Sequence, residues 1–140
     1  MAEFVIGAPI LLFLLYCIVE FGRAFMQFSL LADAARDADR YLATKALSGS
    51  SGVIIISGTD SGSAKNLVVY GNTAGAGAPL LPGLLVSHVT VASDASQNVS
   101  ISVAYPYQSL FGGSIPKFFT SGSINTGAMT LNVYTSMRAL

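Results

Sequence analysis

The sequence contains little charge and a single cysteine, and each shortage excludes a class of function. Only 10% of its 140 residues are charged, against about 25% in an average globular protein. Seven basic and seven acidic residues cancel, so no net field attracts nucleic acid or an acidic partner. Because Cys17 is the only cysteine, we expect neither an internal disulfide framework nor a cysteine-based zinc module.

Motifs that carry catalysis or bind cofactors are also missing. The sequence contains no G-x-S-x-G nucleophile motif whose serine the only histidine, His88, could activate. We therefore expect His88 on a strand surface. The glycine-rich stretch 71–77 lacks the G-K-[ST] ending of a phosphate cradle. Asp33, Asp37 and Asp39 alternate with arginines on a predicted helix, which indicates a solvated face rather than a metal site. The sequence therefore predicts no enzyme, no cofactor and no metal centre.

The residues that are present divide the chain into two parts. Nine of the fourteen charged residues lie in the first 45 positions, whereas twelve of the fourteen glycines follow residue 48. We therefore predict a long N-terminal helix over residues 1–47 and a Gly/Ser-rich β domain over residues 48–140.

An apolar segment opens the predicted helix. Phe4–Val19 holds sixteen residues without a charge, and the run continues apolar beyond it apart from Glu20, Arg23 and Gln27. About 20 apolar residues span a bilayer, so the segment predicts a membrane helix, with Glu20 and Arg23 neutralising one another near one edge. A signal peptide is disfavoured because the start, MAEF, has no base and no A-x-A site follows. We expect Pro9 to kink or open this helix near residues 5–8.

The second half of the helix is predicted to be amphipathic. Apolar residues recur there at helical spacing: Ala34, Ala35, Ala38, Tyr41, Leu42 and Ala46. Asp33–Arg36 and Asp37–Arg40 are spaced as ion pairs, and Ser48–Gly49 is a stop signal. At about 1.5 Å per residue, the predicted helix is a rod roughly 67 Å long. We infer that half of it is buried by something other than its own domain.

The rest of the sequence predicts a small antiparallel sheet packed on the C-terminal half of the rod, which makes the fold class α+β. Val53–Ile56 is expected to be a brief strand or a buried tether. A short helix is predicted over Asp60–Tyr70, with Asp60 or Ser61 as its N-cap. The alternating runs predict strands at Val86–Ala92, Asn98–Tyr105 and Ala128–Met137. Loops are predicted at 71–83 and 93–98, and a surface excursion at Pro106–Gly127.

Several short motifs occur along the sequence in a specific combination. The N-terminal motifs are Glu3-Phe4, Pro9, Glu20-Phe21-Gly22-Arg23, Ala34-Ala35-Arg36 and Arg40-Tyr41. The C-terminal motifs are NLVVYGN at 66–72, VTV at 89–91, VSISVAYPYQSL at 99–110 and TSMRAL at 135–140. Each motif alone is weak, but together they resemble the TadE-like pilins of tight-adherence (Tad) systems over nearly the whole chain.

The resemblance implies a type IV pilin-like subunit, held in the bacterial inner membrane by its helix before assembly. A prepilin peptidase trims such chains after a short basic leader, and an ATP-driven machine extracts them into an extracellular filament. No basic leader precedes Met1, so we expect the sequence to be that of the mature chain. Glu3 also lies nearer the start than the acid of most type IV-like pilins.

The expected function is therefore that of a structural pilin that polymerises with copies of itself for adhesion to surfaces. We expect Glu3 to pair with the α-amino group of a neighbouring copy, so that both charges are buried together. The residues predicted at the subunit interface are Met1, Glu3, Phe4, Pro9, Glu20, Phe21, Gly22 and Arg23. Two alternatives remain open: a minor priming pilin, or a membrane-anchored binding module that uses Tyr105–Tyr107 and the Pro106–Gly127 region without polymerising.

Overall fold

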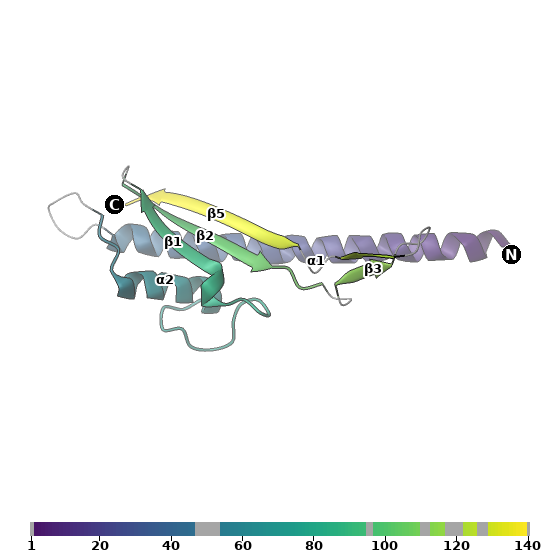
Figure 1. Ribbon diagram of the computed structural model, residues 1–140, viewed down its shortest axis with the longest axis horizontal. Helices are drawn as coiled ribbons and strands as arrows, with labels where there is room; N and C mark the ends of the chain where they lie inside the picture. Colours follow the sequence, from purple (N-terminus) through teal and green to yellow (C-terminus); the bar gives the residue numbers. More distant parts are fainter. Residues whose placement is uncertain are drawn as a thin grey trace.

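A computed structural model shows a long helix with a small sheet and a second helix packed on its C-terminal half (Figure 1). The structure describes residues 2–46, 54–94, 97–109, 113–116, 122–125 and 129–139. Its elements are α1 (Ala2–Lys45), α2 (Gly58–Tyr70), the 3-10 helix η1 (Val86–His88), β1 (Val89–Asp94), β2 (Asn98–Pro106), β3 (Ser114–Pro116), β4 (Ser123–Asn125) and β5 (Thr130–Arg138). This arrangement confirms the predicted α+β, pilin-like fold class.

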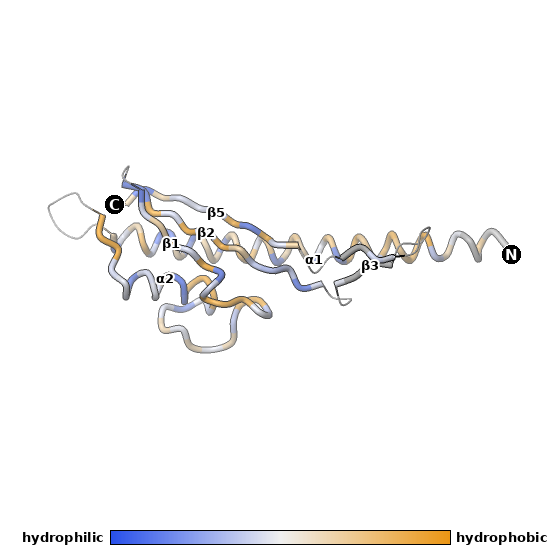
Figure 2. Tube along the Cα trace, in the orientation of Figure 1, coloured by the Kyte–Doolittle hydropathy of each residue, from blue (hydrophilic) through white to orange (hydrophobic). Residues whose placement is uncertain are grey.

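Helix α1 packs on the sheet through one stripe of its second half. Leu31, Ala35, Ala38, Leu42 and Ala46 follow helical spacing, and all five are buried. None of the five side chains is branched at Cβ and three are alanines, so the sheet approaches the helix closely without a loss of helix propensity. The first half of α1 extends beyond the sheet toward the N-terminus, and apolar residues recur along it (Figure 2).

Helix α1 continues through Pro9 without interruption, so the predicted opening near residues 5–8 is wrong. The missing N–H of Pro9 removes one helical hydrogen bond, and the bonded residues on both sides hold the backbone in place. Pro9 lies near the start of a 44-residue helix, where the loss of a single bond leaves a long bonded segment behind it.

The sheet has strand order β1-β2-β5, and both of its strand pairs are antiparallel. In the central strand β2, Val99, Ile101, Val103 and Tyr105 are buried, whereas the side chains between them are more exposed. This alternation confirms the strand predicted there, and Val103 lies opposite Val89 on one side and Val133 on the other. The buried face therefore forms a layer over α1.

Helix α2 begins earlier than predicted. Its N-cap is Ser57, whose hydroxyl accepts a hydrogen bond from the Asp60 backbone N–H at 3.1 Å and donates one to Asp60 Oδ2 at 2.6 Å. Asp60 is thus the third helical residue rather than the cap, in an arrangement close to a capping box. The helix ends at Gly71, whose positive φ of 71° suits the left-handed cap.

The connections were predicted less completely than the main strands. The segment 71–83 contains no regular element, as expected, and Tyr105 fixes it by donating a hydrogen bond to the Pro82 carbonyl at 2.8 Å. The Pro106–Gly127 excursion contains the two-stranded sheet β3–β4, which the sequence did not indicate. His88 lies in η1 rather than on a strand, and its Nδ1 accepts a hydrogen bond from the Leu85 N–H.

Asp39 does not lie on a solvated face, which corrects the prediction for this residue. Its relative exposure is 1%, because it lies on the side of α1 that meets the sheet. Neither carboxylate oxygen has a well-formed hydrogen bond within the described residues. Burial raises the pKa of Asp39, and the nearby Thr135 hydroxyl on β5 acts in the opposite direction. The Asp33–Arg36 ion pair, at 2.9 Å, forms as predicted on the exposed side.

The buried Asp39 predicts a pH-dependent stability. A carboxyl whose folded pKa is raised stabilises the fold fully below its unfolded pKa of 3.8, and that contribution is lost as the pH rises through the folded pKa. Asp39→Asn has no such loss, so its free energy of unfolding relative to wild type should increase between pH 3.5 and pH 7, conditions on either side of that value.

Denaturant unfolding of the full chain in detergent micelles at both pH values measures this difference. Asp37→Asn is the matched control, because Asp37 is exposed on the same helix. An unchanged difference between Asp39→Asn and wild type at the two pH values would contradict the account of Asp39.

Candidate assembly interface

The free half of α1 presents a continuous apolar surface. The exposed large apolar residues on this helix are Phe4, Ile10, Leu11, Leu12, Leu14, Leu15, Ile18, Val19, Phe21, Phe25, Met26, Phe28 and Leu30. A soluble monomer seldom exposes so long an apolar patch. Among the described residues, one helix is long and apolar enough to cross a membrane. The rest of the chain covers almost none of the most apolar segment of this helix.

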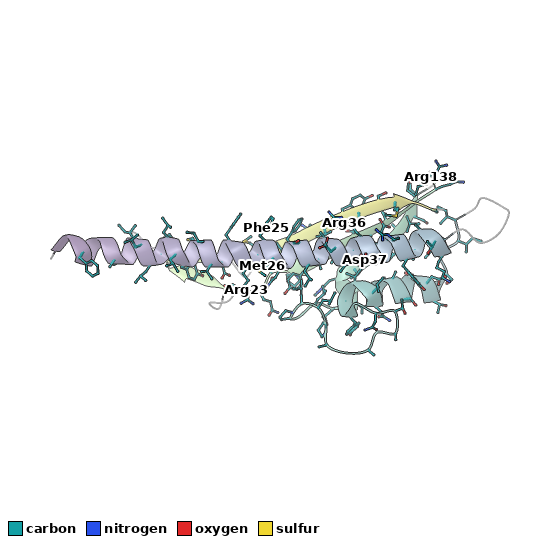
Figure 3. All side chains as sticks on the ribbon, turned by 180° about the vertical axis from the view of Figure 1, so that it is seen from behind. Arg23, Phe25, Met26, Arg36, Asp37 and Arg138 are labelled. Carbon is teal, nitrogen blue, oxygen red and sulfur yellow. The ribbon has the colours of Figure 1, made fainter. Side chains whose placement is uncertain are left out.

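The apolar surface is longer than a bilayer requires. From Glu3 to Arg23 the helix rises about 30 Å, the thickness of a typical hydrocarbon core. Phe25, Met26, Phe28 and Leu30 follow this stretch and are still exposed, with Phe25 at 67% (Figure 3). A membrane that covers the first six turns therefore leaves these four side chains in water unless another molecule covers them.

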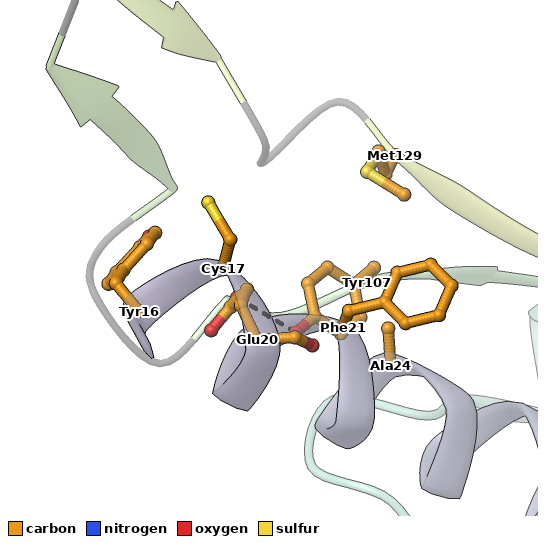
Figure 4. Close-up of a pocket in the computed structure, with 7 residues that line it drawn as sticks. All are labelled: Tyr16, Cys17, Glu20, Phe21, Ala24, Tyr107 and Met129. Atoms are coloured by element: carbon orange, nitrogen blue, oxygen red, sulfur yellow. Dashed lines mark hydrogen bonds between the residues drawn. The ribbon is translucent and has the colours of Figure 1, made fainter. Parts of the chain in front are cut away.

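A polar contact fixes the C-terminal domain to α1 where the sheet ends. The Tyr107 hydroxyl donates a hydrogen bond to Glu20 Oε1 at 2.8 Å and lies 3.3 Å from the Glu20 carbonyl oxygen (Figure 4). Both side chains are buried, with Glu20 only 8% exposed. Desolvation, reinforced by the hydrogen bond to Glu20 and its negative charge, raises the pKa of Tyr107 to about 12, and Arg23 acts against this rise.

A half-open cavity of about 180 Å³ lies beside this contact. Its lining is almost entirely apolar and comes from two parts of the chain: Tyr16, Cys17, Glu20, Phe21 and Ala24 of α1, together with Tyr107 and Met129 (Figure 4). The second carboxylate oxygen of Glu20, Oε2, is buried with no hydrogen-bond partner in the described part of the chain. This cavity is called the Glu20 pocket below.

The predicted interface residues differ in their exposure and in the space around them. Phe4 and Phe21 are exposed, and Pro9 is exposed within the unbroken helix. A Cβ on Gly22 would meet nothing within 4 Å, so this position leaves room for close helix packing. Met1 and the side chain of Glu3 lie outside the described residues, so the roles of both stay predictions.

Glu20 and Arg23 do not form the ion pair that their spacing predicts, within the residues that the structure describes. Instead, Glu20 Oε1 accepts a hydrogen bond from the hydroxyl of Tyr107, which is 87 residues away in the sequence. The predicted Asp37–Arg40 pair is likewise not formed within the described ranges.

Sequence reasoning missed Tyr107 and Met129 as parts of this site. Tyr105 and Tyr107 are separated by one residue within VSISVAYPYQSL, but they form separate contacts: Tyr105 anchors the 71–83 loop and Tyr107 contacts the helix. Nothing local to Met129 marks it as the wall of a pocket. In the described ranges, no group of three or more His, Cys, Asp or Glu side chains could hold a metal ion.

Comparison with known proteins supports the interpretation of the N-terminal motifs. The family model described as TadE-like protein matches residues 1–40, which include Glu20, Phe21, Gly22 and Arg23. The match therefore confirms the resemblance to TadE-like proteins over this segment. No curated protein and no solved structure matches the chain.

The Tyr107 contact predicts a measurable stability loss. Tyr107→Phe keeps the ring but leaves Glu20 Oε1 buried without its donor, so the free energy of unfolding should fall by about 1–3 kcal/mol. Denaturant unfolding of the full chain in micelles measures this, with Tyr134→Phe, at a 71% exposed position on β5, as the matched control. Equal stability of the two variants would show that the contact does not hold the domain to the helix.

Proposed function

We propose that this protein is a structural subunit of a Tad-type, type IV-like pilus. In this proposal the chain is held in the bacterial inner membrane by α1, and the Tad assembly machinery extracts it into an extracellular filament after trimming by a prepilin peptidase. Copies then associate through the exposed apolar surface of α1, and the C-terminal domain forms the outside of the fibre, which adheres to surfaces.

The observation that carries the proposal is the apolar surface at Phe25, Met26, Phe28 and Leu30. These side chains lie beyond the length of helix that a bilayer covers, and the chain's own sheet does not cover them. Lipid accounts for burial of the first six turns, whereas burial of these four residues requires a protein partner. A second copy of α1 supplies an apolar surface of matching length.

The same surface favours a polymer over an anchored binding module. A binding module needs only one hydrophobic segment long enough to span the membrane. Because each copy exposes apolar residues on a long rod rather than in a closed patch, a bundle of staggered rods covers all of them while leaving the sheet domains on the outside. Small residues such as Gly7 and Gly22, each open around its Cα, permit close approach of the rods.

Sheared surface fibres test the proposal directly. The fibres should contain this chain as their main subunit by mass spectrometry. A chain present only in trace amounts would make it a minor priming pilin, and a chain that stays in the membrane while fibres are normal would contradict the proposal.

Phe25→Glu should abolish fibres while leaving the chain in the membrane at wild-type level. The reason is that a charge at this position cannot be buried against a neighbouring helix without a cost of several kcal/mol. Tyr134→Glu is the matched control, since Tyr134 is similarly exposed but lies on β5, away from the free half of α1 (Figure 1). Fibre yield by electron microscopy, with membrane fractionation, decides the outcome; normal fibres from Phe25→Glu would exclude this surface from assembly.

Glu3→Ala should also block fibre assembly and leave the chain in the membrane. The proposed reason is that Glu3 pairs with the α-amino group of a neighbouring copy, so removal of the carboxylate leaves a buried positive charge alone. Fibre yield measured as above checks this, and normal fibres from the variant would remove Glu3 from the mechanism.

A further inference from the structure

The Glu20 pocket has the properties of an unfilled acceptor for a cation. Glu20 is more than nine-tenths buried, and Tyr107 satisfies only Oε1. Oε2 has no partner among the described residues, although it is buried beside a half-open cavity of about 180 Å³. A buried carboxylate with an unsatisfied oxygen is costly, and a cation that enters the cavity removes that cost.

Arg23 is a cation without an ion pair or hydrogen bond in the described part of the chain, and it lies one turn from Glu20. At about 100° per residue, Arg23 projects roughly 160° around the helix axis from Phe21, one of the α1 residues that line the pocket. Arg23 and the Phe21 side of the pocket therefore lie on different flanks of the same helix. Such an arrangement suits a contact between two different surfaces of neighbouring copies.

We propose that Arg23 of one copy enters the Glu20 pocket of the next copy and pairs with Glu20 Oε2. This inference rests on the proposed function and names the contact that sets the register of neighbouring helices. Because the two partners lie on different flanks, each copy offers the pocket on one side and the arginine on the other. The contact is heterologous and repeats without closing, as a filament requires.

The observations favour a second copy over a lipid headgroup as the source of the cation. An ammonium headgroup could also reach Glu20 at the membrane edge, but a lipid there leaves Phe25 and Phe28, the next turns of the helix, exposed to water. A neighbouring α1 that delivers Arg23 covers these side chains as well. The same contact therefore satisfies the charge and the apolar surface together.

Arg23 also fits better than the other two arginines of the helix. Arg36 is already paired with Asp33 at 2.9 Å. Arg40 follows Glu20 by twenty residues, or about 30 Å along the helix, and a neighbour shifted that far would lose contact with much of the apolar surface. Arg23 requires a stagger of only about 4.5 Å between parallel helices, which keeps nearly all of that surface buried.

Charge reversal distinguishes a contact between copies from one within a chain. Glu20→Arg alone and Arg23→Glu alone should each lower fibre yield at least about tenfold, since like charges then meet at every contact. Co-expression of the two single variants should restore fibres, because alternating copies re-form a pair of opposite charges at each contact. Arg40→Glu is the matched control and should assemble normally.

A pair within one chain gives a different pattern. The double variant E20R/R23E would then assemble, whereas the mixture of single variants would not, and that result would overturn the inference while leaving the proposed function intact. Absence of wild-type fibres containing this chain would instead contradict the proposed function.

Cross-linking tests the same contact with Glu20 intact. Cys17 lines the pocket, and Arg23→Cys places a second thiol at the predicted entering position. A short bifunctional methanethiosulfonate reagent, added to cells that express the full chain, should give covalent dimers of Arg23→Cys. Dimers should be absent from wild type, from C17S/R23C and from R40C, so that only a link between Cys17 of one copy and the introduced thiol of another explains them. Equal dimer yields from Arg23→Cys and R40C, or no dimers from Arg23→Cys, would overturn the inference, including the case in which a lipid headgroup occupies the pocket.

Discussion

Helix α1 carries apolar side chains along its whole length, but the three-stranded sheet packs only on its second half. Over residues 31–46 the stripe Leu31, Ala35, Ala38, Leu42 and Ala46 is buried under β2 and β5. Ahead of Leu31, most of the large apolar side chains that the structure describes are exposed. The free energy available from burying them is of the order of 25 cal/mol per Å², and it is released only when a membrane or another molecule takes the place of water.

The Glu20–Tyr107 contact lies within the uncovered part of α1, about three turns before Leu31. It joins this part of the helix to the chain that leaves β2, so the sheet domain cannot move along α1 without breaking a buried hydrogen bond. Burying the Glu20 carboxylate costs desolvation free energy that an apolar pair of similar volume would not, and such a pair would pack equally well. The buried polar contact therefore fits a role in fixing the register of the helix, which the packing of Leu and Phe alone specifies poorly.

Much of this architecture could be predicted from the sequence because it follows from local periodicity. The alternation of Val99, Ile101 and Val103 specifies a strand with one buried face, and the spacing of Ala35, Ala38 and Leu42 specifies the helical stripe beneath it. The division into residues 1–47 and 48–140 also rests on local composition and stays a proposal. The fold class follows from these patterns and from the absence of any signal for a second core.

The parts that were not predicted depend on contacts between distant residues. Asp39 carries the same charge pattern as its exposed neighbour Asp37, and packing of the sheet on its face of α1 buries it. Glu20 has an arginine at ideal spacing, yet it binds Tyr107 instead. The β3–β4 pair consists of two three-residue strands in a Gly- and Pro-rich segment, where no alternation is long enough to detect. Local propensity was overridden by tertiary packing in the first two cases and was too weak to read in the third.

If copies of α1 bury the uncovered half of α1, a helical reconstruction of sheared fibres by electron cryomicroscopy will show a fibre whose axis is a bundle of α1 helices. Phe25 and Phe28 should lie inside the bundle and the sheet domains outside. A fibre in which α1 lies at the periphery with Phe25 and Phe28 facing solvent, or one built through contacts between sheet domains alone, would contradict this expectation.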